Sequence, residues 1–329
     1  MMDELIAGFT SHLKEAVQVG KKADFSNTDN SLMNVLVCGL GGSGIGGTII
    51  SQLVSEQCAL PITVNKDYKI PSFVNQDTLV ICCSYSGNTE ETLEMYQQAY
   101  DKGAEIAIIT SGGKFAEIAK KIGHNIIEIR GGFPPRAAFG LSFPQLFFVL
   151  NQYGLINNDF EAQIEEAMKL MDAEESAIQA EAKEVAKKMH GTFPIIYTEA
   201  PMEGVAVRFR QQIAENSKML SSHHVIPEMN HNELVGWRTK NEDLSVIFFR
   251  SKDEYYRNTA RIEKSKEVAS EYTSNVIEIV AKGDGKIQQA LYLIHFGDWI
   301  TYDLAELKGI DSVEVDVITG LKDMLAGLA

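Results

Sequence analysis

The sequence predicts an α/β protein of two tandem doubly wound domains, each a mainly parallel sheet flanked by helices. Three observations lead to this prediction. Apolar segments of strand length alternate with segments of helical periodicity; the alternation begins again after a long charged helical segment; and glycine- and hydroxyl-rich turns follow two of the strand segments. Continuous apolar strands separated by single helices are typical of parallel sheets that are covered on both faces.

The composition suits a large globular enzyme or binding protein. The 329 residues are enough for two domains, and 45% of them are hydrophobic. The net charge of −15 argues against broad nucleic-acid binding, but it does not exclude a small anionic ligand bound by local donors. No apolar run reaches the roughly 18 residues that a membrane span needs, and the amphipathic start lacks the features of a signal peptide. We therefore expect a cytoplasmic protein without a membrane segment.

The four cysteines are expected to be reduced and packed as small apolar side chains. Cys38, Cys58, Cys82 and Cys83 all lie in the first third of the chain. Cys82 and Cys83 are adjacent within one predicted strand, so their side chains should point to opposite faces of the sheet. That geometry suits neither a disulfide framework nor a zinc site.

The first half of the chain alternates strands and helices in a regular order. The start of the chain is an amphipathic helix, and "RAAFGLSFPQLFFVLNQYGL" (136–155) is a strongly apolar one. Between them, the predicted strands are 34–40, 61–67, 78–86, 105–112 and 125–132. The predicted helices among these strands are 46–57, 88–103 and 113–123.

The second half repeats this pattern after a charged helical segment over 157–191. "FPIIYTEAPMEGVAVRFRQQIAENSKM" reads as strand, turn and helix, "LSVIFFRSKDEYYRNTARIEKSKEVA" as strand, loop and helix, and "SNVIEIVA" as a strand followed by helices. The first two stretches can be laid over "VLVCGLGGSGIGGTIISQL" and "TLVICCSYSGNTEETLEMY" of the first half. We predict a duplicated α/β domain, 1–154 and 155–329, whose second copy has lost the glycine and serine loops.

The glycine-rich stretch after the first strand is open to a dinucleotide interpretation. Residues 39–44 satisfy the G-x-G-x-x-G spacing of dinucleotide-binding loops. Such a loop also needs an acidic residue at the end of the second strand, for the ribose hydroxyls. Asn65 and Lys66 occupy that strand end and Asp67 falls slightly late, so the interpretation lacks its clearest support.

The turn after the third strand offers a second and more specific set of donors. Ser84, Ser86 and Thr89 provide three hydroxyls within six residues, and Gly87 and Asn88 permit a tight turn before a helix. Ordinary helix capping is the alternative explanation for these hydroxyls. Two such turns at successive carboxyl ends of strands favour a phosphate ester, because ligands of open α/β sheets bind there.

At this point the sequence resembles a known family. "GLGGSGIGG" followed by "SYSGNTEET" is similar to the sugar isomerase (SIS) domain, and "GGFPPRAAFG", "QQIAENSKML" and "VIPEMNHNELVGW" resemble stretches of the bifunctional phosphoglucose/phosphomannose isomerases. These five motifs occur in order over about residues 35–240. The resemblance implies two SIS domains, a dimer, no metal or other cofactor, and a sugar-phosphate substrate.

The resemblance also implies roles for individual residues. Glu215 matches the base that moves a proton between C1 and C2, and Arg136 matches the arginine that stabilises the enediolate oxygens. His231 matches the histidine that assists ring opening, and the partner subunit would contribute it. Substrate-binding positions, for the phosphate and the sugar, are Gly42, Ser43, Ser84, Ser86, Thr89 and Lys322. Asn232 and Glu233 flank the histidine and would orient it.

Two further points bear on the substrate and on metals. Where the family has a threonine associated with mannose-type substrates, this chain has Val313, which puts use of mannose 6-phosphate in doubt. His223 and His224 are adjacent and lack a further ligand at suitable spacing, so no metal site is expected.

Isomerisation of glucose 6-phosphate to fructose 6-phosphate is therefore the leading hypothesis. Another SIS sugar-phosphate isomerase and a non-catalytic sugar-phosphate sensor remain as alternatives. The combination of Glu215, Arg136 and His231 favours catalysis, and the chain has no basic segment of the kind that regulatory SIS proteins use to bind nucleic acid.

Overall fold

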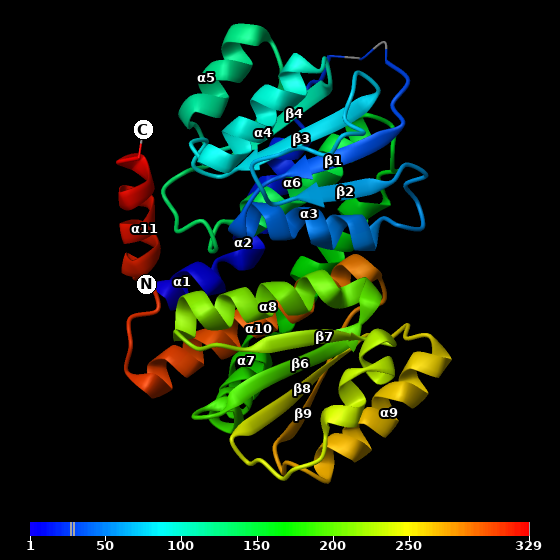
Figure 1. Ribbon diagram of the computed structural model, residues 1–329, viewed down its shortest axis with the longest axis vertical. Helices are drawn as coiled ribbons and strands as arrows, with labels where there is room; N and C mark the ends of the chain where they lie inside the picture. The colour runs from blue at the N-terminus through cyan, green and yellow to red at the C-terminus, as the bar shows by residue number, and fades with distance from the viewer. Residues whose placement is uncertain (27, 29, 329) are drawn as a thin grey trace.

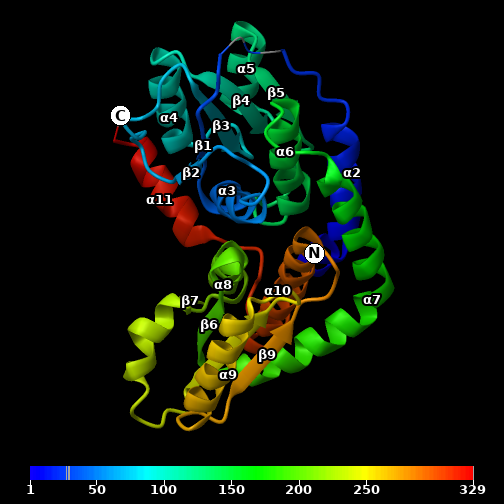
Figure 2. The same cartoon turned by 90° about the vertical axis from the view of Figure 1, so that its right-hand side faces the viewer.

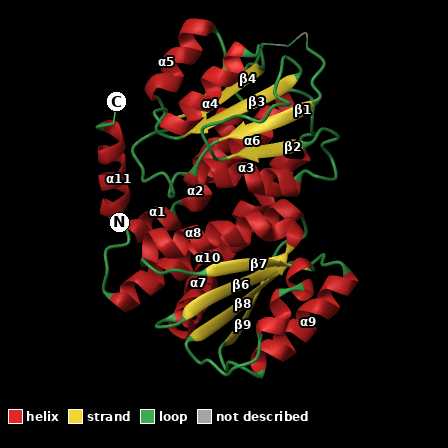
Figure 3. Cartoon of the chain, in the orientation of Figure 1, coloured by secondary structure: helices red, strands yellow, loops and turns green. Residues whose placement is uncertain are grey.

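The computed structural model describes residues 1–26, 28 and 30–328, which form two β-sheets stacked along the long axis of the molecule (Figure 1; Figure 3). In the first half the elements are α1 (Met2–Ala7), α2 (Phe9–Gly20), β1 (Asn34–Cys38), α3 (Gly41–Leu53), β2 (Ile62–Asn65), β3 (Thr78–Ser84), α4 (Glu90–Asp101), β4 (Glu105–Thr110), α5 (Gly113–Ile122), β5 (Asn125–Glu128) and α6 (Phe139–Gln152). In the second half they are α7 (Asp159–Met189), β6 (Phe193–Glu199), η1 (Ala200–Met202), α8 (Glu203–Ser217), β7 (Ser222–Ile226), η2 (Glu228–His231), η3 (Glu233–Gly236), β8 (Leu244–Arg250), α9 (Tyr256–Ser270), β9 (Val276–Val280), α10 (Lys286–Lys308) and α11 (Asp316–Ala326).

Both sheets are parallel, and the four strands of the second follow the order of the first four strands of the first. The first runs β2-β1-β3-β4-β5 and the second runs β7-β6-β8-β9. The chain therefore steps from its first strand outward to one edge and then returns past it to the other, in both halves. This confirms the predicted fold class, two doubly wound sheets flanked by helices.

The start of α3 and the presence of β7 differ from the sequence-based expectation. Helix α3 begins at Gly41, five residues earlier than predicted, because its glycines let the helix start pack directly on β1: a Cβ on Gly44 would lie 2.3 Å from the carbonyl oxygen of Gly39. Strand β7, "SHHVI", was not predicted at all. It is an edge strand, and four of its five residues are only partly buried, so it lacks the apolar pattern that marks the central strands.

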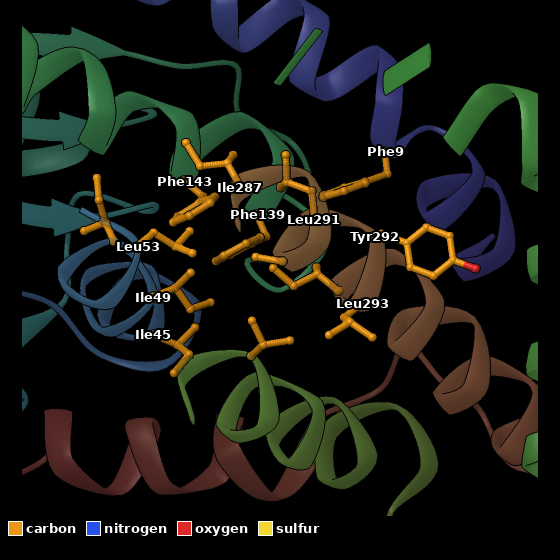
Figure 4. Packing of buried hydrophobic residues seen from close by; sticks show 14 of the residues in the cluster. Phe9, Ile45, Ile49, Leu53, Phe139, Phe143, Ile287, Leu291, Tyr292 and Leu293 are labelled. Atoms are coloured by element: carbon orange, nitrogen blue, oxygen red, sulfur yellow. The ribbon is translucent and has the colours of Figure 1, made fainter. Parts of the chain in front are cut away.

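A single apolar core joins the two halves. One cluster of buried side chains runs from β1 and α3 through α6 to α8 and α10. Figure 4 shows Ile45 and Ile49 of α3 facing Phe139 of α6 and Leu291 of α10. Helix α8 packs on both α3 and α10, and α7 spans the two halves along the side of the molecule (Figure 2). The opening between the halves is therefore filled by side chains.

The cysteines lie as expected. Cys82 belongs to the cluster on the α4 and α5 side of the first sheet, and Cys83 to the main core on the other side. All four thiols are free and buried. The division of the chain after Gly154, in the connection between α6 and α7, stays a prediction. Within the described part of the chain, none of the helices combines the length and the apolar character that a membrane crossing requires.

Gly204 gives a test of the contact between the halves. A Cβ at this first turn of α8 would lie 2.7 Å from Cγ1 and 3.0 Å from Cα of Ile49, whereas a Cβ on Gly320 in α11 would meet no atom within 4 Å. We expect Gly204→Ala to lower the free energy of unfolding by about 1–3 kcal/mol. The same substitution at Gly320 should be neutral or raise it by up to about 1 kcal/mol. Urea unfolding checks this; equal effects at both positions would contradict the packing described.

Candidate active site

Arg136 is the buried cation at the centre of the candidate site. It lies just before α6, and only 4% of its surface is exposed. Its Nε donates to Oδ1 of Asn216 (2.7 Å), and its Nη2 donates to the carbonyl oxygens of Ser312 (2.7 Å) and Val313 (2.9 Å). Burial lowers the pKa of Arg136, and the nearby carboxylate of Glu215 opposes this shift. The guanidinium is therefore held in one orientation by groups far apart in the sequence.

Glu215 faces this guanidinium from the last turn of α8. Its Oε2 lies 3.5 Å from Nη1 of Arg136, and 29% of the side chain is exposed. This distance gives Coulombic attraction but exceeds the usual range for an N–H···O hydrogen bond. Among the described residues, Nη1 has no shorter polar contact. The pair thus presents an accessible carboxylate beside a fixed cation that retains donors for another oxygen.

Three residues that the sequence reasoning did not assign hold this pair in place. Asn216 joins Arg136 to α10 by donating its amide to Oγ1 of Thr301 (2.9 Å). Lys218 has a positive φ of 50° and donates Nζ to the carbonyl oxygens of Glu215, Asp311 and Glu314. Both stand in the "QQIAENSKML" motif, so the sequence located the stretch but not these contacts. Ser312 has no signal in the sequence; it contributes only a backbone carbonyl.

A buried ion pair between Arg208 and Asp298 contacts the backbone of Arg136. Arg208 of α8 donates to Oδ2 of Asp298 in α10 (2.8 Å) and to the carbonyl oxygen of Arg136 (3.3 Å). Gln212 donates to the other oxygen of Asp298 (2.9 Å). The guanidinium of Arg208 also lies 4.1 Å above the ring of Phe139, a favourable cation–π arrangement. The start of α6 is thereby tied to both α8 and α10.

The turn after β3 lies at the carboxyl edge of the first sheet. Ser84 Oγ lies 2.8 Å from Thr89 Oγ1, and Asn88 N–H donates to Ser86 Oγ (3.2 Å). Gly87 has a φ of 70°, and a Cβ there would lie 1.8 Å from the carbonyl oxygen of Gly112, so this turn requires glycine. The predicted turn is thus formed in front of the N-terminus of α4.

The glycine-rich start of α3 connects this turn to the arginine. Gly42 and Ser43 line a small cavity together with Cys83 and Tyr85 of the β3 end. A Cβ on Gly42 would lie 3.5 Å from the carbonyl oxygen of Pro135, the residue before Arg136. The structure therefore brings Gly42, Ser43, Arg136 and Glu215 into one continuous region.

His231 and Lys322 do not join this region within the chain. His231 is exposed in η2, beyond the far end of β7, whose five residues span about 16 Å away from the end of α8. Among the described residues, no hydrogen bond or ion pair links His231 to Arg136 or Glu215. Lys322 is exposed on α11, which buries no residue against the chain. Glu233, expected beside the histidine, instead accepts from Tyr197 Oη (2.5 Å).

His223 lies near two charged side chains of α8, Glu203 and Arg210. Its Nε2 is 3.8 Å from Oε1 of Glu203. Burial and the charge of Arg210 lower the pKa of His223. In the part of the chain that the structure describes, no group of three or more His, Cys, Asp or Glu side chains could hold a metal ion.

Comparisons with known proteins find relatives of this chain both in sequence and in fold. Residues 178–325 match the model for the bacterial phospho-glucose isomerase C-terminal SIS domain. A bifunctional phosphoglucose/phosphomannose isomerase from Caldicellulosiruptor bescii is 36% identical over 99% of both chains, and one from Aquifex aeolicus is 36% identical over 88% of this chain and 90% of its own. The fold is similar to the C-terminal domain of glucosamine-fructose-6-phosphate aminotransferase from Francisella tularensis, with a TM-score of 0.78 and 13% identity over 95% of this chain and 98% of that one.

Lys218 tests the assembly of the site without altering the pair itself. Lys218→Asn removes three hydrogen bonds from Nζ, while asparagine tolerates the positive φ. We expect the free energy of unfolding to fall by about 1–2 kcal/mol, since the side chain is partly exposed. Lys22→Asn, at an exposed position after α2, is the control and should change it little. Equal unfolding midpoints for the two variants would mean that Lys218 does not hold residues 311–314 in place.

Proposed function

The chain belongs to the family of bifunctional phosphoglucose/phosphomannose isomerases, and we propose that it interconverts glucose 6-phosphate and fructose 6-phosphate through an enediolate. The observation that carries this proposal is the contact between Glu215 and Arg136. A partly exposed carboxylate stands 3.5 Å from a cation whose other donors are already fixed. That is the arrangement which proton transfer between adjacent carbons, with charge developing on their oxygens, requires.

Glu215 would act as the base and Arg136 as the oxyanion partner. The carboxylate removes the proton from C2 of the open-chain aldose and returns it to C1, while the hydroxyl proton of O2 is transferred to O1, so that one group serves both carbons. The negative charge that forms on the two oxygens faces Nη1 of Arg136. Because that guanidinium is held by Asn216 and two carbonyls, it does not need to reorient as the charge develops.

The phosphate of the substrate would bind at the turn after β3. Ser84, Ser86 and Thr89 supply hydroxyls there, and the N-terminus of α4 supplies backbone N–H groups and a favourable dipole. The hydroxyl of Thr92, on the first turn of α4, is buried and has no hydrogen-bond partner among the described residues. Gly42 and Ser43, between this turn and Arg136, would then face the sugar.

A homodimer would complete the site with His231 from the partner subunit. Support comes from the exposed position of His231 and from apolar side chains that are exposed near it, after the end of α8 and on α11. Val235, close to the histidine, is 69% exposed, and Leu220, just after Lys218, is 81% exposed. Helix α11, with Lys322, carries further exposed apolar residues: Val317, Ile318, Leu321 and Met324. Such surfaces are typical of contacts between subunits.

The use of mannose 6-phosphate is the second part of the proposal. Val313, which replaces the threonine of the family, contributes its carbonyl oxygen to Arg136, so the segment lies against the guanidinium. This backbone contact does not depend on the side chain of Val313. The side chain itself would alter the shape of the site at C2 of the sugar, where glucose 6-phosphate and mannose 6-phosphate differ.

We further propose a cytoplasmic location, where buried reduced thiols such as Cys82 are ordinary.

Glu215→Gln tests the assignment of the base. It keeps the shape of the side chain and removes its ability to accept a proton, so kcat for glucose 6-phosphate should fall about 10²–10⁴-fold in the presence of EDTA. Glu203→Gln, on the first turn of the same helix, is the matched control and should leave kcat nearly unchanged. Mannose 6-phosphate is assayed in parallel. Tight binding of glucose 6-phosphate with no turnover by the unaltered protein would favour the sensor instead.

Mixed dimers test the contribution of His231 across the interface. Chains with His231→Ala and chains with Glu215→Gln should each be inactive, whereas a mixture should regain about a quarter of the normal activity, because half of the dimers are mixed and each has one intact site. Mixing Glu215→Gln with Arg136→Gln chains is the control and should regain none, since both residues act in the same chain. Absence of regain in the first mixture would contradict the proposed role of the partner's histidine.

A further inference from the structure

A buried carboxylate occupies the carboxyl edge of the second sheet. Glu199, the last residue of β6, is only 5% exposed. Its Oε1 accepts from the backbone N–H of Tyr255 (3.2 Å) and from Nδ2 of Asn258 (2.8 Å), and its Oε2 accepts from Oγ of Ser251 (3.1 Å). We call Ser251, Tyr255 and Asn258 the Glu199 donor set. They comprise a hydroxyl after a strand, a backbone N–H at a helix start and an amide on the first helical turn.

The register of the two sheets aligns two members of this donor set, Tyr255 and Asn258, with positions of the proposed phosphate turn and the helix start after it. Cys38 pairs with Cys82 between β1 and β3, and Tyr197 pairs with Phe248 between β6 and β8. Leu40 lies two residues after Cys38, and Glu199 lies two residues after Tyr197, so Leu40 corresponds to Glu199. By the same count from Cys82 and Phe248, Thr89 corresponds to Tyr255 and Thr92 corresponds to Asn258. Helices α4 and α9 accordingly start at Glu90 and Tyr256, which also correspond.

The corresponding donors differ in whether they are satisfied. In the first half, the buried hydroxyl of Thr92 has no hydrogen-bond partner among the described residues, and Thr89 N–H makes one long contact of 3.4 Å with Ser84 Oγ. In the second half, Asn258 and the N–H of Tyr255 both donate to Glu199. The side chain of Leu40, at the position of Glu199, cannot accept a hydrogen bond and packs instead with the apolar cluster beside α4.

We infer that the second half retains an oxyanion-binding site and that the carboxylate of Glu199 fills it permanently. The two oxygens of a carboxylate accept from a hydroxyl, a helix-terminal N–H and an amide, the same kinds of donor that bind phosphate oxygens. Each chain would then take one sugar phosphate, at the turn after β3. This last point rests on the proposed function, whereas the occupation of the Glu199 donor set does not.

Formate rescue tests the inference directly. Glu199→Ala should unfold at a lower temperature than the unaltered protein, and sodium formate should raise its melting temperature by roughly 2–4 °C above sodium chloride of equal ionic strength. Formate fits because it restores the deleted carboxylate and is smaller than the deleted group by one methylene. Glu199→Gln and Glu199→Leu keep the volume of the side chain, so formate and chloride should act alike on them. If Glu199→Ala folds poorly, its refolding yield in the two salts gives the same comparison. Equal effects of formate and chloride on all variants would overturn the inference.

Binding stoichiometry separates this inference from the proposed function. Calorimetry with glucose 6-phosphate and the Glu215→Gln chain should give one molecule per chain, and Ser84→Ala should weaken that binding. Two molecules per chain would overturn the inference, because the second half would then be open to phosphate. Absence of binding together with formate rescue would contradict the proposed function and support the filled site of the second half.

Discussion

The burial of the Arg136 guanidinium is the constraint on which the site depends. A cation without water must have its donors satisfied, and here the acceptors come from α8 and from residues 312–313, about 80 and 176 residues away in the sequence. The start of α6, the end of α8 and the segment before α11 must therefore meet at one point. Glu215 is positioned as a consequence, because it precedes the asparagine that accepts from Arg136. The acid–base group and the cation are thus placed by one set of contacts.

The shared core explains how such distant segments are kept in register. Helix α8 belongs to the second half but packs on α3 of the first, where Gly204 allows its backbone to lie against Ile49. Because apolar side chains of both halves form one cluster, a change in the angle between the sheets would expose core surface. The two halves therefore form a common support, and the distance between Glu215 and Arg136 follows from how α8 packs beside the turn that precedes α6.

The sequence was informative where a local pattern carries the signal. The apolar strands, the alternation of Cys82 and Cys83 and the turn at Gly87 follow from periodicity and backbone sterics, and the structure agrees with them. It was silent on β7, because an edge strand with partly buried residues has no apolar run. It was also silent on Ser312, because a backbone carbonyl can come from any residue type. The contact of Arg136 with Asn216 depends on packing between distant helices, which no local pattern encodes.

The duplication of the sheet accords with the proposed arrangement, in which the first half binds the phosphate and the second half supplies the base. The strand order that the two sheets share places two equivalent carboxyl edges in each chain, and an unfilled edge of this kind attracts anions. In the second half the edge is closed by Glu199, so its helices are free to serve another purpose. Helix α8 then directs its last turn toward the first half, where Glu215 meets Arg136. A carboxylate base and a bound phosphate repel each other electrostatically when adjacent, and the proposed assignment to different halves keeps them apart across the length of the sugar.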